Sequence, residues 1–224
     1  MLRSLSVLLL SCSIAASQTP PPAPAPTPAP EPTPAAVEVV VPTFPNATCP
    51  IMGKKVSQPL FIDTELGRFW VCCKPCFKKI RANVPAAHKT AYPVVTDAKN
   101  TTCPVSGKPI GEGAPLVTLQ GHRFAVHSEA EVALAQQHSQ TTLVKLLRPG
   151  VRDVGNKTCP LTGEAVAANA FVVIGDAIVH LAAGKGLADV KDASAVLAKA
   201  EELAKTLVID RKSTRLNSSH ANIS

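Results

Sequence analysis

The stretch NATCPIMGKKV, residues 46–56, decides the fold because it occurs three times in the chain. It returns as NTTCPVSGKPI at residues 100–110 and as NKTCPLTGEAV at residues 156–166. The shared frame is Asn-x-Thr-Cys-Pro, followed by an aliphatic residue, any residue and Gly. Self-similarity at a nearly even spacing predicts a repeat architecture with three copies of one small module. Each Asn also begins an Asn-x-Thr glycosylation acceptor, but an Asn that starts a turn before the cysteine explains the same pattern, and we favour the turn.

Each copy continues with two short apolar runs around a turn. The first runs are residues 60–63, 116–119 and 171–174, and the second runs are residues 68–71, 123–126 and 177–179. Two such runs with a Gly-bearing turn between them predict a β-hairpin. A helical stretch follows in each copy, most clearly at residues 193–207, where apolar residues recur on one helical face.

The sequence therefore predicts an α+β fold of three tandem ββα modules of the zinc-finger or treble-clef type. We place the modules at residues 46–96, 97–153 and 154–209. Modules of this size have thin cores and usually need a metal, a disulfide or one another for stability.

The segment FWVCCKPCFKKI, residues 69–80, carries three cysteines whose chemistry the repeat helps to assign. When the second strands are aligned, Cys72 corresponds to histidine in the other two copies, whereas Cys49 corresponds to cysteine in both. A Cys-to-His exchange suits two ligands of a metal ion but not a disulfide, which histidine cannot form. The predicted metal ligands are Cys49, Cys72, Cys73 and Cys76 in the first copy, Cys103 and His127 in the second, and Cys159 and His180 in the third.

The position of Cys76 differs most between the copies, with Glu131 in the second and Gly184 in the third. Ser128 and Glu131 have the spacing of a helix capping box, which explains the glutamate without a metal. His138 follows on the same helical face, and we expect it to face solvent. The second copy should bind metal more weakly than the first, the third most weakly or not at all, and both should fold without metal.

The first copy resembles the TRASH-type heavy-metal-binding domains in the spacing of Cys49, Cys72 and Cys76, and CPIMG…FWVCCKPCFKKI is similar to the related YHS family. The resemblance covers residues 46–92 and implies binding, trafficking or sensing of metal ions. Many YHS members have a second knuckle cysteine where this chain has Met52. Four thiolates suit Zn²⁺, and three, with or without Met52, suit Cu⁺, so both ions stay open as the cofactor.

Three alternatives to metal binding remain. An oxidising compartment allows structural disulfides between these cysteines. The Cys73-Lys74-Pro75-Cys76 motif at a helix start is typical of a thioredoxin-like oxidoreductase, but that fold needs a longer βαβ framework than these short repeats offer. A plain interaction scaffold without metal is the third. We find no Ser-His-acid set, phosphate loop or His-Glu-x-x-His motif, and we expect a metal-ion-binding protein for sequestration, delivery or sensing, not an enzyme.

The ends of the chain indicate export. Residues 1–17 have a basic start, an apolar run and small residues, which predict a secretory signal peptide. A lipoprotein-like Leu9-Leu10-Ser11-Cys12 makes a lipid anchor on Cys12 an alternative. Residues 18–45 are rich in proline and predict a semi-rigid polyproline II linker. A DNA sequence that resembles a common sequencing-library adapter can encode residues 210–224, which we expect to be an artefact and not to continue the preceding helix.

Charge and hydropathy limit the classes of partner that the chain is expected to bind. The chain of 224 residues has a formal net charge of +7, but its Lys and Arg look dispersed, without a basic stripe with interleaved aromatics, so we expect no nucleic-acid partner. Beyond the N-terminal run, no segment is long and apolar enough to span a membrane. We expect a periplasmic or extracellular protein whose partners are a metal ion and a membrane-bound metal transporter or other envelope protein.

Overall fold

The structure is a computed structural model that describes residues 38–219, with side chains described for residues 38–206. The predicted signal peptide, Cys12, most of the predicted linker and the last five residues lie outside the described residues. All described residues belong to one compact unit of the chain. Its elements are β1 (Val39–Val40), β2 (Phe61–Thr64), β3 (Gly67–Trp70), α1 (Pro75–Ala82), α2 (Val84–Ala91), β4 (Thr96–Asp97), β5 (Leu116–Leu119), β6 (His122–Ala125), α3 (Glu129–Gln137), α4 (Ser139–Leu147), β7 (Arg152–Asp153), β8 (Phe171–Ile174), β9 (Ala177–His180), the 3₁₀ helix η1 (Leu187–Asp189) and α5 (Ala193–Ser219).

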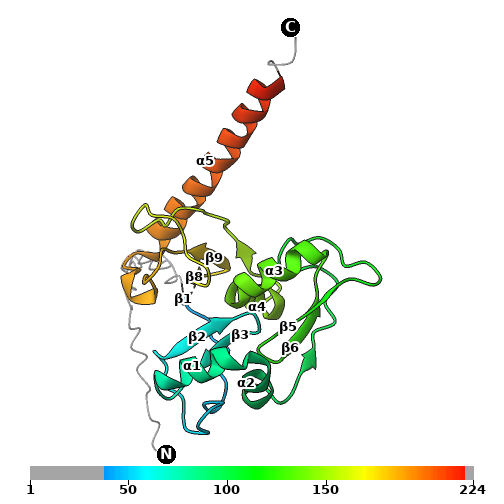
Figure 1. Ribbon diagram of the computed structural model, residues 1–224. Helices are drawn as coiled ribbons and strands as arrows, with labels where there is room; N and C mark the ends of the chain where they lie inside the picture. The colour runs from blue at the N-terminus through cyan, green and yellow to red at the C-terminus, as the bar shows by residue number, and fades with distance from the viewer. Residues whose placement is uncertain (1–37, 220–224) are drawn as a thin grey trace, which may run out of the picture. The chain divides into compact units, whose positions relative to one another are not determined.

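The described residues form an α+β fold of small hairpins and short helices (Figure 1). The three predicted hairpins are present as the antiparallel pairs β2–β3, β5–β6 and β8–β9. Their registers are equivalent, because Phe61 lies opposite Trp70, Leu116 opposite Ala125, and Phe171 opposite His180. No described helix is both long enough and apolar enough to cross a membrane.

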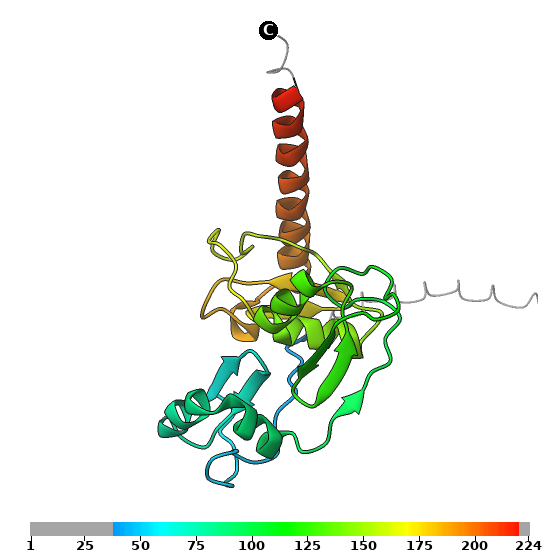
Figure 2. The same cartoon turned by 45° about the vertical axis from the view of Figure 1, so that its right-hand side comes forward.

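The helices differ from the single helix predicted for each copy. Two short helices follow each of the first two hairpins, and η1 and α5 follow the third (Figures 1 and 2). In the first copy, Asn83 separates the helices, because its side chain accepts a hydrogen bond from the N–H of Ala86 at 3.0 Å and caps α2. Pro85 then lacks the N–H that a continuous helix would need there.

Helix α5 also corrects the expectation for the C-terminal tail. It runs from Ala193 to Ser219, so it continues past residue 209, where we expected the helix to end. The origin of residues 210–224 in an adapter sequence stays a prediction.

The repeated cysteine frame folds into the same turn in each copy, here called the knuckle. An isolated bridge closes each knuckle, between Thr48 and Lys55, Thr102 and Pro109, and Thr158 and Ala165. The glycine of each frame has a φ of +64° to +75°, in the left-handed region that favours glycine. The invariant spacing from cysteine to glycine in the three copies is therefore a backbone requirement.

The asparagine of each frame joins the knuckle to the hairpin. The Asn46 amide donates to the carbonyl oxygens of Thr48 and Trp70 and accepts from the N–H of Trp70, at 2.7 to 2.9 Å. Asn100 makes the same bonds with Thr102 and Ala125, and Asn156 makes them with Thr158 and His180. This supports the structural explanation of the Asn-x-Thr pattern, because the amide is already fully used.

Short extra strands shift the predicted module boundaries. Strand β1 lies in the predicted linker, yet it pairs with β8 of the third copy. Strand β7 lies in the predicted second module, yet it pairs in parallel with β9, as β4 pairs with β6. In the first copy, side chains instead of a strand bond to this edge of the hairpin. The amide oxygen of Gln120 accepts from the N–H of Arg68 at 3.0 Å, and the hydroxyl of Tyr92 donates to the carbonyl oxygen of Arg68 at 2.7 Å.

The copies support one another through α4. This helix belongs to the second copy, lies against β3 of the first, and places Val144 in a cluster with Phe171, Val173 and Ile178 of the third. Its Gln140 bonds to Gln120, and the N–H of Gln140 donates to Asn169 of the third copy at 2.9 Å. Thin cores are thus completed by neighbouring copies, one of the three solutions that the sequence left open.

Candidate metal centre

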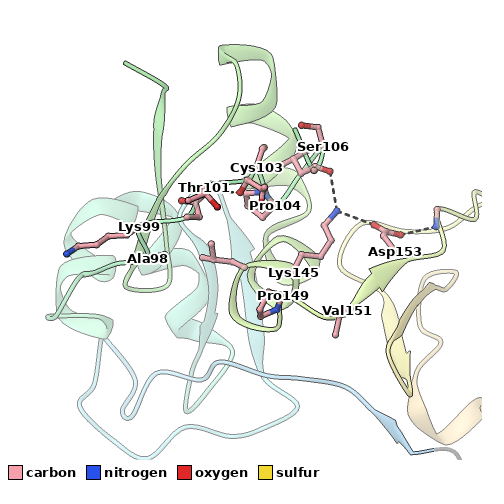
Figure 3. A pocket seen from close by; sticks show the side chains of 16 residues that line it. Ala98, Lys99, Thr101, Cys103, Pro104, Ser106, Lys145, Pro149, Val151 and Asp153 are labelled. Carbon is pink, nitrogen blue, oxygen red and sulfur yellow. Dashed lines mark hydrogen bonds and ion pairs between the residues drawn. The ribbon is translucent and has the colours of Figure 1, made fainter. Parts of the chain in front are cut away.

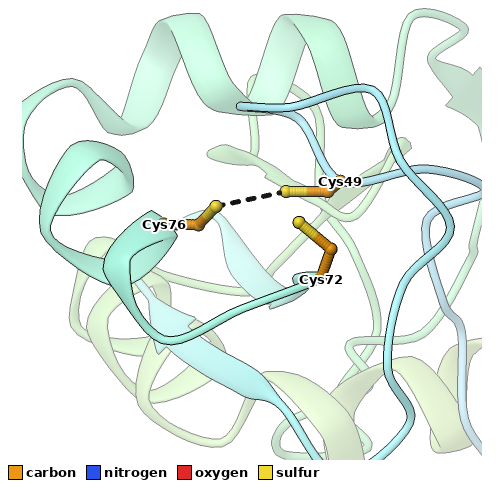
Figure 4. Close-up of side chains that lie close together, drawn as sticks. All are labelled: Cys49, Cys72 and Cys76. Carbon is orange, nitrogen blue, oxygen red and sulfur yellow. Dashed lines mark hydrogen bonds between the residues drawn. The ribbon is translucent and has the colours of Figure 1, made fainter.

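Three cysteines of the first copy converge from different elements. Cys49 lies on the knuckle, Cys72 follows β3, and Cys76 lies in the first turn of α1 (Figure 4). Their Sγ atoms all lie within 4.8 Å of one another. These separations are short enough for the three side chains to share one ion.

The sulfur separations match a thiolate site better than a disulfide. The Sγ atoms of Cys49 and Cys76 are 3.6 Å apart, and the Sγ atom of Cys73 lies 3.5 Å from that of Cys76 and 3.8 Å from that of Cys72. Zinc–sulfur bonds of about 2.3 Å in a tetrahedron give sulfur–sulfur edges of about 3.8 Å. A disulfide would need about 2.05 Å, and the six cysteines of the described residues are all free thiols.

The three thiols differ in acidity. Burial raises the pKa of Cys49, but hydrogen bonds from the backbone of Cys72, Ile51 and Met52 outweigh it and lower that pKa to about 7. Burial, reinforced by the neighbouring thiols, raises the pKa of both Cys72 and Cys76. The first negative charge of the cluster therefore forms on Cys49, and a bound cation would displace protons from the other two, because metal ligands are thiolates.

In the second copy, a carboxylate stands where the first copy has Cys76. The thiol of Cys103 donates to Oε2 of Glu131 at 3.0 Å, and the N–H of His127 donates to the same atom at 3.0 Å. Cys103 and the backbone of His127 therefore share one carboxylate oxygen, whereas the pairing of Cys103 with the imidazole of His127 stays a prediction. The imidazole Nδ1 of His127 lies 3.0 Å from the carbonyl oxygen of Pro109.

The expected capping box of Glu131 is wrong. Ser128 is the N-cap of α3 but makes no side-chain capping bond, and the glutamate reaches the N–H of His127, one residue earlier, together with the thiol. The bond from Cys103 lowers the pKa of this buried carboxyl despite the opposing effect of burial. Glu131 is a charged partner of the knuckle cysteine.

In the third copy, the alignment of His180 with Cys72 is wrong by two residues. The bonds of His180 to Asn156, and its position opposite Phe171, make it equivalent to Trp70 and Ala125. The residue equivalent to Cys72 is Ala182, whose backbone opposes the effect of burial on the pKa of Cys159 as the Cys72 backbone does for Cys49. The slot of Cys76 then falls on Gly186 instead of Gly184, so these positions give Cys159 no second ligand.

The imidazole of His180 instead joins an acidic side chain that sequence reasoning missed. Its Nε2 lies 2.8 Å from Oδ1 of Asp153, which also accepts from the N–H of Gly155. Lys145 donates to the carbonyl of Val105 at 3.2 Å and lies 3.4 Å from Asp153 (Figure 3). Lys145 and Asp153 line a cavity of about 620 Å³ beside the second knuckle, and their opposite charges are paired with each other.

One further residue departs from expectation, and the contact of Glu131 with Cys103 could have been inferred from the repeat. His138 is half-buried and not solvent-facing, and burial lowers its pKa. Glu131 lay at the slot of Cys76, so the repeat alignment contained a signal for its contact with Cys103, but its capping spacing offered a simpler explanation.

Comparisons of this chain with protein-family models, with curated proteins and with solved structures find no match.

Proposed function

We propose that the chain binds a thiophilic metal ion, Zn²⁺ or Cu⁺, through Cys49, Cys72 and Cys76. The observation that carries the proposal is the convergence of three free sulfur atoms within 4.8 Å of one another. Its role is sequestration, delivery or sensing of the ion in the periplasm or outside the cell, with a metal transporter or other envelope protein as partner. The resemblance of residues 46–92 to TRASH and YHS domains supports the same role.

Cys73 determines how many thiolates the ion receives. Its sulfur touches those of Cys72 and Cys76, and both Cys72 and Cys73 are half-buried, so they remain reachable from solvent. Zn²⁺ would use Cys73 as a fourth ligand, whereas Cu⁺ would be satisfied by three.

We infer that the three modules are copies of one metal-binding ββα unit, of which only the first keeps its ligands. Equivalent knuckles, asparagine bonds and hairpin registers support this inference. The contact between Cys103 and Glu131 corresponds to that between Cys49 and Cys76. A hydrogen bond from thiol to carboxylate links the knuckle of the second copy to its helix where a metal ion would link them in the first.

A thiol–disulfide oxidoreductase is the second candidate, because the sulfurs of Cys73 and Cys76 are 3.5 Å apart. Within the cluster, however, the thiol whose pKa is lowered is Cys49, which lies outside that pair. Such an enzyme needs its low-pKa thiol in the Cys-x-x-Cys motif. Metal binding is therefore favoured.

The test is the metal content of the full chain purified under reducing conditions. We expect about one equivalent of Zn²⁺ or Cu⁺ per chain, lost in Cys49→Ala and in Cys76→Ala. Both variants should also melt earlier, because metal binding stabilises the folded module. Cys159→Ala is the matched control, since it removes a buried knuckle cysteine that has no partner ligand, and it should keep its metal. Full metal content in both first-copy variants would refute the proposal, and insulin reduction that requires Cys73 and Cys76 would favour the oxidoreductase.

A further inference from the structure

The expectation that Lys and Arg are dispersed is wrong for residues 46–209, because their surplus positive charge lies in the first module, which holds the cysteine cluster. The first module, residues 46–96, has eight Lys and Arg against two acidic residues, whereas the second has six against five and the third has five against six. The two acids of the first module, Asp63 and Glu65, both lie on the β2–β3 hairpin. The knuckle and α1, which hold the cysteines, have no acidic residue.

Six of these cations form what we call the basic cluster: Lys54, Lys55, Lys74, Lys78, Lys79 and Arg81. All six are exposed, and none takes part in an ion pair with another described residue. Lys54 and Lys55 lie on the knuckle of Cys49, and Lys74 lies between Cys73 and Cys76. Of the eleven Lys and Arg of the other two modules, five are paired with an acid: Arg123, Lys145, Arg152, Lys185 and Lys199.

The positive charge of the basic cluster is larger than the negative charge of a metal–thiolate site. Zn²⁺ on four thiolates, or Cu⁺ on three, carries a net charge of about −2. The six cations, which lie on the knuckle, just before α1 and on α1, therefore leave a surplus of about four positive charges on the segments that hold the cysteines. The other copies do not repeat the whole pattern: the second copy keeps a cation at the position of Lys54, as Lys108, but has Glu129 at that of Lys74, and the third copy has Glu164 at the position of Lys54. The cations accompany the thiols and not the fold.

We propose that the basic cluster is the docking surface for an acidic protein that exchanges the metal ion with this chain, an inference that rests on the proposed function. Metal transfer needs soft ligands from the partner beside Cys72 and Cys73, and a protein supplies thiolate, thioether or imidazole. Complementary charge would bring the partner to the cluster faster and orient it there.

Other anionic partners fit this surface less well. Single-stranded nucleic acid needs free aromatic faces for stacking, but the face of Phe61 is covered by the guanidinium of Arg68 at 3.8 Å from the ring centroid. An anionic membrane needs an apolar face to enter, but the exposed positions of α1 are Pro75, Lys78, Lys79, Arg81 and Ala82.

The experiment measures metal transfer from the loaded full chain to two synthetic peptides that share one Cys-x-x-Cys pair. One peptide has flanking Asp and Glu, and the other has flanking Lys. We expect the acidic peptide to receive the ion about ten-fold faster or more at low salt, and the difference to vanish near about 0.5 M salt. Lys74→Gln/Lys78→Gln/Lys79→Gln should lose this advantage at unchanged metal content. The control Lys108→Gln/Lys157→Gln/Lys191→Gln, which removes three exposed unpaired lysines elsewhere, should keep it.

Equal transfer rates to both peptides, or an unaffected first triple variant, would overturn the proposal. Salt-sensitive cosedimentation with phosphatidylglycerol vesicles, without a preference between the peptides, would overturn it in favour of a membrane. A second measurement separates failure of the docking surface from failure of the proposed function. It follows, by fluorescence anisotropy, how tightly the metal-free chain binds the acidic peptide with its cysteines replaced by serine. If the chain holds no metal, the docking surface is still supported when only the first triple variant weakens peptide binding. It is refuted when that variant does not weaken peptide binding.

Discussion

Glu131→Gln should destabilise the protein without affecting metal binding by the first copy. The change keeps the shape of the side chain but removes the charge that accepts hydrogen bonds from Cys103 and from the N–H of His127, each at 3.0 Å. Glu131 is only 8% exposed, so water cannot replace these bonds fully. Hydrogen bonds to a charged group contribute about 1.5–3 kcal/mol each, against about 0.5–1.5 for neutral pairs, so we expect a loss of about 2 kcal/mol in the free energy of unfolding.

The pH dependence provides a sharper signature. The pKa of Glu131 is lowered in the folded protein, so the stability that its charge contributes is fully present above the unfolded value of about 4.3. It is lost as pH falls through the folded pKa. The stability difference between wild type and Glu131→Gln should therefore be largest near neutral pH and shrink below about pH 4.

Urea denaturation followed by circular dichroism and by the fluorescence of Trp70, the single tryptophan, measures this difference. Glu129→Gln is the matched control, because Glu129 lies exposed in the same helical turn and makes no described side-chain bond. We expect it to change stability by less than about 0.5 kcal/mol. Equal effects of the two variants at neutral pH, or a difference for Glu131→Gln that persists unchanged in acid, would refute the role of the carboxylate.

Three other substitutions test the equivalence and the packing of the copies. His127→Cys/Glu131→Cys restores the ligand pattern of the first copy beside Cys103, so metal analysis should show a second equivalent; a content unchanged from wild type would speak against copies of one site. Under mild oxidation, Ala182→Cys should lose two more free thiols than wild type by pairing with Cys159, and His180→Cys should lose no more than wild type, as counted with a thiol reagent; the opposite result would restore the sequence alignment. Gly67→Ala should cost more than about 1 kcal/mol in urea denaturation, because φ is +99° and the new Cβ would lie 2.7 Å from Cγ of Gln120, whereas Gly111→Ala meets nothing within 4 Å and should be neutral.

Much of the fold could be predicted from the repeated sequence frame. Cysteine, glycine and asparagine recur at fixed spacings because each serves the local backbone. Gly53 and its equivalents adopt a left-handed φ, and the asparagines bond to groups within about 25 residues. Hairpin positions followed from short-range apolar runs. The convergence of Cys49, Cys72 and Cys76 follows from the same local geometry, since a knuckle and a strand end bring them together.

The contacts between copies could not be predicted from the sequence. The helices α1 and α2, or α3 and α4, differ from one helix only through a break whose position depends on packing. Gln120 serves the first copy from the second, and β1 pairs with the third copy across more than a hundred residues of chain. Such pairings depend on how folded pieces meet, and no local period in the sequence records them.

The two errors in the candidate site have the same physical origin. A shift of two residues in the third copy keeps every strand residue on its side of the sheet, so apolar alternation cannot distinguish His180 from Ala182 as the equivalent of Cys72. The position of Glu131 in the sequence fits both a helix capping box and a contact with Cys103. Only the position of the knuckle in the folded protein decides between them. The sequence by itself therefore determined the repeat, its turns and the cysteine triad, because these depend on neighbours along the chain. Tertiary structure alone decided the register of the third copy and the partner of Glu131, because hydrogen-bond partners are chosen by distance in space.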